Sequence, residues 1–180
     1  MKTLTRMVLA LALVSVAFAA DDVVSAVHGT VTKLDSAGHT VVVKTADGTE
    51  HSLHLVKETT VHGAHASADA AKDSWHGVTE GSEVVAHYTK RGTEDTALEV
   101  DKVGKGGLRA TEGTIKDIDR GAKTMVVKTA DGTEKTFKLT DHAAKDGGKD
   151  IGEGTEKGAK VVVYSTEVSG KKVAHFFEKI

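Results

Sequence analysis

The sequence predicts an all-β protein made of two tandem five-stranded barrels, each with a short helix between its third and fourth strands. Three observations support this prediction: an internal repeat, short segments in which apolar and polar residues alternate, and an Asp-Gly pair between two such segments. The stretch KTADGTE occurs at residues 44–50 and again at 128–134. The match extends on both sides of this stretch to two copies of about 80 residues. Two such copies predict two domains, because solenoids need three or more shorter units.

The first residues have the pattern of a secretory signal peptide, which we assign to residues 1–19. Lys2 and Arg6 precede a short apolar run, and Ala17-Phe18-Ala19 forms a small-x-small cleavage signal. The run is too short to span a bilayer, so we expect no membrane span. The sequence has no cysteine, which excludes disulfides, thiolate metal sites and a lipidated cysteine anchor. We therefore expect a periplasmic or secreted protein.

The repeat divides the exported part into residues 20–104, a glycine-rich linker at residues 105–108, and residues 109–180. The linker composition, with Gly104, Gly106 and Gly107 around one lysine, predicts a flexible hinge. Removing Lys2 and Arg6 leaves 22 basic residues against 26 acidic ones, a net charge of −4. A mildly acidic surface disfavours nucleic-acid binding.

The first three strands of each repeat are predicted from spacing. The first strand has apolar residues three apart: Val31 and Leu34, then Ile115 and Ile118. This spacing predicts a bulge near Thr32 and Lys116, as a small closed barrel requires. The second and third strands alternate with period two, and the Asp-Gly pair between them predicts a type I′ hairpin turn. The ladder of oxygen ligands of an EF-hand calcium loop is absent from this turn.

The remaining elements complete each barrel. Residues 64–74 are rich in alanine and predict the helix, and residues 83–89 and 96–103 predict the last two strands. This order is that of an OB-like barrel, with an SH3-like barrel as the alternative. We predict that three lysines are exposed, Lys44, Lys128 and Lys138, and that twelve apolar residues are buried: Val41, Val43, Leu53, Leu55, Val84, Val100, Met125, Val127, Phe137, Leu139, Val161 and Phe177.

Four stretches, GTVTKLD, TVVVKTADGTE, GSEVVAHYT and KKVAHFFEKI, resemble a bacterial family of unknown function that consists of exported, often tandem, small β-barrels. That resemblance implies no particular activity and no catalytic residues. The architecture is similar, more distantly, to the periplasmic copper chaperones of silver and copper efflux systems, which use a His, a Trp and two Met. The exported part has a single methionine, Met125, so the resemblance implies no copy of that copper site.

Eight of the ten histidines lie in the first repeat, which suggests copper or zinc as a candidate cofactor. His62, His65 and His76 are the group that a single inter-strand segment is able to gather, and we name them as candidate metal ligands. His54 and His87 occupy outward-facing strand positions, where we interpret them as surface substitutions. The alternative to the metal hypothesis is that no cofactor is bound.

Two aromatic residues are candidate interface residues. Trp75 lies in the segment that closes the first barrel, where an indole more often fills a core than binds a ligand. Phe176 aligns with Glu99 of the first repeat, and both are predicted to face outward. We predict that Phe176 meets the other barrel or a partner, the alternative being an isolated surface residue.

No catalytic motif accompanies these features. The sequence has no G-x-S-x-G and no H-E-x-x-H, and the predicted outward face of the second and third strands has no aromatic residue on which a base is able to stack. We therefore expect a protein that is not an enzyme and binds no nucleic acid. Two hypotheses remain: a non-catalytic module that binds an envelope protein or a glycan, and a histidine-dependent metal-binding or buffering protein.

Overall fold

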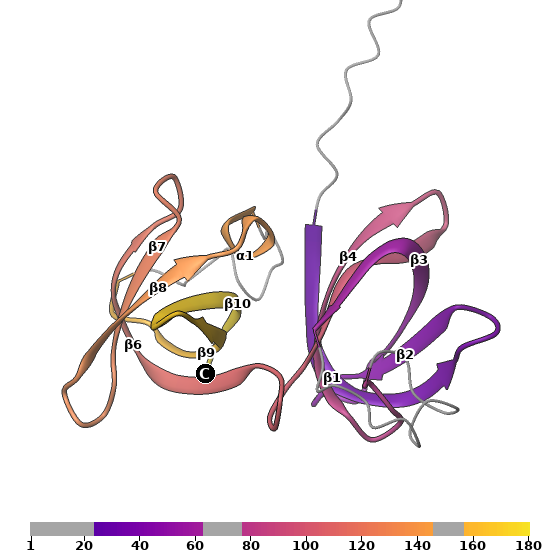
Figure 1. Ribbon diagram of the computed structural model, residues 1–180, viewed down its shortest axis with the longest axis horizontal. Coiled ribbons are helices and arrows are strands. Elements are labelled where there is room, and N and C mark those ends of the chain that lie inside the picture. The colour runs from indigo at the N-terminus through magenta and orange to yellow at the C-terminus, as the bar shows by residue number, and fades with distance from the viewer. Residues whose placement is uncertain (1–23, 63–76, 146–156) are drawn as a thin grey trace, which may run out of the picture.

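The computed structural model describes residues 24–62, 77–145 and 157–180. These residues form ten strands and one short helix, arranged as two closed five-stranded barrels that lie side by side (Figure 1). The predicted all-β class is confirmed. Residues 1–19, the predicted signal peptide, lie outside the described residues. No helix within the described ranges is long and apolar enough to cross a membrane.

The first barrel contains strands β1 (Val24–Asp35), β2 (Thr40–Lys44), β3 (Glu50–His62), β4 (Glu83–Arg91) and β5 (Glu94–Lys102). Their order around the barrel is β1-β2-β3-β5-β4, and β4 closes it by pairing with β1. β3 and β5 are parallel, whereas the other neighbouring strands are antiparallel. Placing β5 between β3 and β4 gives the Greek-key connection of an OB-like barrel.

The second barrel repeats this order with β6 (Arg109–Asp119), β7 (Thr124–Lys128), β8 (Glu134–Leu139), β9 (Lys160–Val168) and β10 (Lys171–Lys179). Helix α1 (Asp141–Lys145) follows β8, at the predicted place between the third and fourth strands. Asp141 lies in its first turn, where a negative charge favours helix formation. The corresponding helix of the first barrel, predicted at residues 64–74, lies outside the described residues.

The predicted bulges are confirmed in both barrels. The pairing of β1 with β2 shifts between Val31 and Lys33, which leaves Thr32 as the extra residue. The pairing of β6 with β7 shifts in the same way between Ile115 and Asp117. Each bulge increases the bend of a long strand, which allows it to pair with neighbours on both sides of a closed barrel.

The hairpin turn between β2 and β3 differs from the type I′ prediction. Gly48 has a φ of 90°, but Asp47 is not among the residues with positive φ, so only one central residue is left-handed. The Asp47 carboxylate accepts a hydrogen bond from the Thr49 amide (3.0 Å) and another from the Thr45 hydroxyl. These bonds favour a three-residue loop closed by glycine over the two-residue turn. The second barrel has the same loop at residues 129–133.

The predicted core is confirmed. All twelve apolar residues predicted to be buried have exposed fractions of 4% or less, and the three predicted surface lysines are exposed. Each barrel has its own hydrophobic cluster. The cluster of the second barrel also includes Val85, with Ala26 and Val103 packed against it. These three residues belong to the first repeat, so the two barrels pack directly against each other.

The linker differs from the flexible hinge that its composition predicts. The Leu108 amide donates to the Lys102 carbonyl at 2.7 Å, and the Gly104 amide donates to the Leu108 carbonyl at 2.8 Å. The Leu108 side chain is fully buried. A side chain at Gly107 would place its Cβ 1.9 Å from the Lys102 carbonyl oxygen. The glycines therefore permit a tight, hydrogen-bonded turn that connects two packed barrels.

Candidate metal centre

Strands β4 and β5 of the first barrel turn polar side chains toward the second barrel. His87 follows the core residue Ala86, and Glu99 precedes the core residue Val100, so both point out of their own barrel. Their exposed fractions are nevertheless only 0% and 5%, because residues of α1 and β10 cover them. The interpretation of His87 as a surface substitution is therefore wrong, since the position faces outward but is covered by the other barrel.

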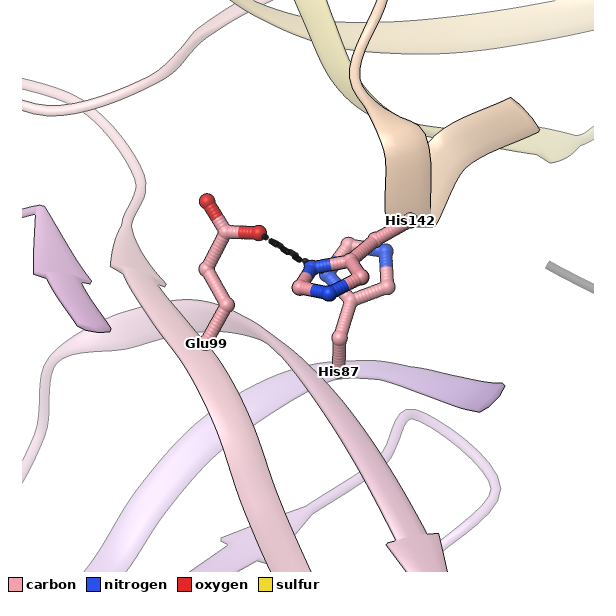
Figure 2. A group of neighbouring side chains, drawn as sticks. All are labelled: His87, Glu99 and His142. Atoms are coloured by element: carbon pink, nitrogen blue, oxygen red, sulfur yellow. Dashed lines mark hydrogen bonds and ion pairs between the residues drawn. The ribbon is translucent and has the colours of Figure 1, made fainter. Parts of the chain in front are cut away.

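Glu99 lies in the middle of this contact. Its Oε2 atom is 2.9 Å from Nδ1 of His142 and 3.9 Å from Nδ1 of His87 (Figure 2). Its Oε1 atom is 3.1 Å from Nδ1 of His175, and the same nitrogen is 3.0 Å from Oδ2 of Asp101. We call these five residues the inter-barrel centre. Three of them come from the first barrel and two from the second, so neither barrel alone forms it.

Helix α1 and a bulge in β10 orient the two histidines of the second barrel toward Glu99. His142 is the second residue of α1. Thr140, the residue just before α1, donates its amide to the Ala174 carbonyl of β10 at 3.0 Å and so fixes the start of the helix beside β10. His175 is the extra residue of a bulge, since the pairing of β10 with β9 shifts between Ala174 and Phe176. A bulge re-aims one side chain, and bulges are common beside functional sites.

Glu99 is ionised, and the pKa values of the histidines around it are shifted in different directions. Burial disfavours the charged form of Glu99, but hydrogen bonds from His142 and His175 outweigh this effect and hold the Glu99 pKa well below its ordinary value. Burial also opposes protonation of His175, but hydrogen bonds to Asp101 and Glu99 raise its pKa to about 9. The hydrogen bond to Glu99 raises the pKa of His142.

His87 behaves in the opposite way. Burial lowers its pKa to about 4, and the attraction of the Glu99 carboxylate only partly offsets this. At neutral pH His87 is therefore a neutral imidazole next to an ionised carboxylate. A neutral imidazole is the form that binds a metal ion.

A second polar contact between the barrels surrounds His28 on β1, and we call it the His28 cluster. His28 Nε2 is 2.8 Å from Oε1 of Glu83, and His28 Nδ1 is 3.1 Å from Oε1 of Glu178 on β10. The Tyr164 hydroxyl donates to Glu178 at 2.7 Å. Burial opposes protonation of His28, but the two carboxylates outweigh it and raise the His28 pKa.

Aromatic contacts lie between the two polar groups. The Phe176 ring stacks on Tyr164 with a centroid distance of 5.7 Å and is T-shaped to the His87 ring, at a centroid distance of 6.2 Å. Phe176 is 3% exposed. The structure thus places this residue, predicted to face outward, between its own barrel and the first barrel.

The other predicted site residues are not brought together in the part of the chain that the structure describes. His62 is the last residue of β3, and its side chain is not described. His65, Trp75 and His76 lie outside the described residues. The metal group predicted from these histidines stays a prediction.

Sequence reasoning missed the centre because its signal was spread over both repeats. His142 and His175 are the only histidines of the second repeat, and both belong to the centre. At the offset of 77 that aligns the last strands of the repeats, His175 matches Leu98. The pairing of β4 with β5 skips Leu98 as the pairing of β9 with β10 skips His175. The same bulge therefore has an apolar side chain in one barrel and a histidine in the other.

The donor atoms of the centre fall into two sets. His87, Glu99 and His142 place their ligand atoms within 4.8 Å of one another, and so do Glu99, Asp101 and His175. All donors are imidazole nitrogens or carboxylate oxygens, which suit zinc and divalent copper. The soft sulfur ligands that monovalent copper prefers are not part of either set.

Two solved structures with a small β-barrel resemble part of this chain. No protein-family model matches the chain, and no curated protein matches its sequence. Solved structures that resemble it include Ag(I)CusF, at 12% identity and a TM-score of 0.33 over 44% of this chain and 96% of that chain. Another is CusF-Ag(I) from Escherichia coli, at 11% identity and a TM-score of 0.34 over 45% and 92%. Membership of the tandem-barrel family stays a prediction.

Proposed function

We propose that this chain is an exported, non-catalytic protein that binds a divalent transition-metal ion, zinc or copper, at the inter-barrel centre. One observation carries the proposal: two imidazole nitrogens, from His87 and His142, and a carboxylate oxygen of Glu99 lie within 4.8 Å of one another. Two imidazoles and one carboxylate, with a position left for water or another ligand, form a donor set that zinc takes in proteins.

The electrostatics of the three donors support this choice. Glu99 is ionised and His87 is neutral, so two of the three ligands already have the protonation state that metal binding needs. The hydrogen bond to Glu99 raises the pKa of His142, and His142 is the most exposed of the three, with a side-chain exposure of 33%. We infer that a metal ion enters from the side of His142.

The location of the centre also bears on the stability of the protein. Replacing buried charged residues by apolar ones is often neutral or stabilising. A cluster of two carboxylates and three histidines between two barrels is therefore poorly explained as a device for stability alone. Binding of a cation between the barrels gives this polar cluster a function.

The remaining parts of the proposal rest on the sequence. The signal-peptide pattern supports export, and the lack of a catalytic motif supports a binding protein over an enzyme. Binding of an envelope protein or a glycan stays a prediction, with no ligand chemistry assigned.

The test is a calorimetric titration of the tag-free mature protein with Zn(II) and with Cu(II). We expect saturable binding that weakens by at least about tenfold, or about 1.4 kcal/mol, in His87→Gln and in His142→Gln. His54→Gln, a change on the side of β3 away from the core, is the matched control and is expected to leave the affinity unchanged. Equal affinities in all four proteins would exclude the inter-barrel centre as the metal site.

A further inference from the structure

The two oxygens of Glu99 face two different groups of ligands. Oε2 is directed at His142 and His87, at 2.9 and 3.9 Å, and Oε1 is directed at His175, at 3.1 Å. Each oxygen thus belongs to a set of three possible ligands, and Glu99 is the only residue that the two sets share.

We propose that Glu99 bridges two metal ions, so that the inter-barrel centre is a dinuclear site. This inference rests on the proposed function and adds a second ion to it. The first ion binds His87, His142 and Oε2 of Glu99. The second ion binds His175, Asp101 and Oε1 of Glu99. Ions in two-metal sites lie about 3.5–4 Å apart. One ion on each oxygen of a single carboxylate is compatible with this separation, because each ion lies about 2 Å beyond its own oxygen.

The ligands of the second position are already buried and close together. Asp101, Glu99 and His175 are all buried, with exposed fractions of 0%, 5% and 6%. Nδ1 of His175 lies 3.0 Å from the Asp101 carboxylate and 3.1 Å from the Glu99 carboxylate. Ligands about 2 Å from a common zinc ion lie about 3.3 Å from one another, so small movements suffice to admit an ion.

A residue behind His175 fixes the direction of its ring. Nε2 of His175 is 3.0 Å from the Thr166 hydroxyl on β9, which leaves Nδ1 to face the two carboxylates. Orienting a histidine ligand through its second nitrogen is the usual arrangement at metal sites. The proposed second cation would sit between Nδ1 of His175 and the two carboxylates that face it.

The charges of the centre set the order of loading. Glu99 and Asp101 offset only part of the charge of two divalent ions, so each ion disfavours the other. The first set has two imidazoles and an entry side at His142, whereas the second set is fully buried. We therefore expect the first position to fill at lower metal concentration than the second.

The test measures stoichiometry and metal-metal coupling in the tag-free mature protein. Titration with Cu(II), followed by native mass spectrometry, is expected to give two ions per chain, the second at least about tenfold weaker. Electron paramagnetic resonance of the doubly loaded protein is expected to show coupling between the two copper ions. Asp101→Asn keeps the shape of the side chain and is expected to bind one ion with an uncoupled spectrum. Glu94→Gln, at the exposed start of β5, is the matched control and is expected to bind two.

The outcomes separate this inference from the proposed function. One ion per wild-type chain with an uncoupled spectrum overturns the dinuclear site and leaves the single-ion proposal standing. No bound ion overturns both. Two ions without coupling, or two ions in Asp101→Asn, place the second ion elsewhere and overturn the bridging role of Glu99. The wild-type spectrum alone decides the question if Asp101→Asn does not fold.

Discussion

The outward faces of the two barrels differ much more than their cores do. At the offset of 77, His87 and Glu99 of the first barrel correspond to Tyr164 and Phe176 of the second. These four residues are buried against one another at the contact between the barrels. Inward-facing positions such as Val84 and Val161 remain apolar in both repeats.

This difference indicates that the function depends on the outward faces of the barrels and not on their cores. A barrel of this size has a core filled by side chains, so its inward face has little freedom to change. The outward face of the first barrel carries imidazoles and carboxylates, and the second barrel faces it with aromatic rings together with His142 and His175. The two faces depend on each other, because the aromatic rings of the second barrel cover the polar groups of the first and exclude water from them.

The largest expected effect comes from breaking the aromatic side of this contact. Phe176→Glu places a carboxylate between Tyr164 and His87, close to the acidic residues of the first barrel. We expect the free energy of unfolding to fall by about 4 kcal/mol and the barrels to separate, which small-angle scattering would show as a larger radius of gyration. Val168→Glu, at an exposed position on β9, is the control. Identical scattering and stability in the two variants would contradict the proposed packing.

The next largest effect is expected from removing the charge of Glu99 in the inter-barrel centre. Glu99→Gln keeps the shape of the side chain but leaves His175, whose pKa is raised to about 9, and His142 without their shared carboxylate. Because removing one partner of a buried ion pair leaves an uncompensated charge, we expect a loss of about 3 kcal/mol in chemical denaturation. Glu94→Gln is the matched control, with an expected change below about 0.5 kcal/mol. A loss that does not exceed that of the control would mean that the histidines are neutral in the folded protein.

A smaller effect is expected in the His28 cluster. Burial, together with the bond to Glu178, raises the Tyr164 pKa, so its hydroxyl stays protonated and donates to Glu178. Tyr164→Phe removes this donor and keeps the ring stack with Phe176, at an expected cost of about 1 kcal/mol. The same change in a His28→Gln background should cost less, since the two residues share Glu178. Additive losses in this double-mutant cycle would show that they act independently.

The smallest effect is a pH dependence of the same cluster. The His28 pKa is raised in the folded protein by Glu178 and Glu83. Protonation therefore stabilises the folded protein fully below pH 6.5, the ordinary value, and this stabilisation is lost as the pH rises through the raised pKa. Since the cluster is partly exposed, we expect a contribution of about 0.2–1 kcal/mol. Denaturation of the wild type and His28→Gln at several pH values measures it, and a difference that grows with pH would contradict the sign.

The fold could be predicted from the sequence because it depends on local patterns that occur twice. Apolar residues three apart located the bulge at Thr32, and alternation located the buried positions of the strands. The turn type could not be predicted from the Asp-Gly pair, because the Asp47 carboxylate binds its own loop and changes the preferred backbone. The linker could not be predicted from its glycines, because Leu108 anchors it in the second core.

The site could not be predicted in the same way. Alternation shows that His87 and Glu99 face out of the barrel, but it contains no information about what covers them. The signal that was available lay in the mismatches between the repeats, where imidazole or carboxylate in one copy aligns with an aromatic ring in the other. Phe176 was singled out on this basis, but its neighbour His175 was not, because no partner for it was visible along the chain.

The central claim is that a metal ion binds where the two barrels meet, and anomalous X-ray scattering from crystals of the zinc-loaded protein tests it most directly. The account predicts a zinc peak bonded to Nδ1 of His87, Nδ1 of His142 and the carboxylate of Glu99, at about 2 Å from each. A peak bonded instead to His62, His65 or His76, with the inter-barrel centre free of zinc, would contradict it.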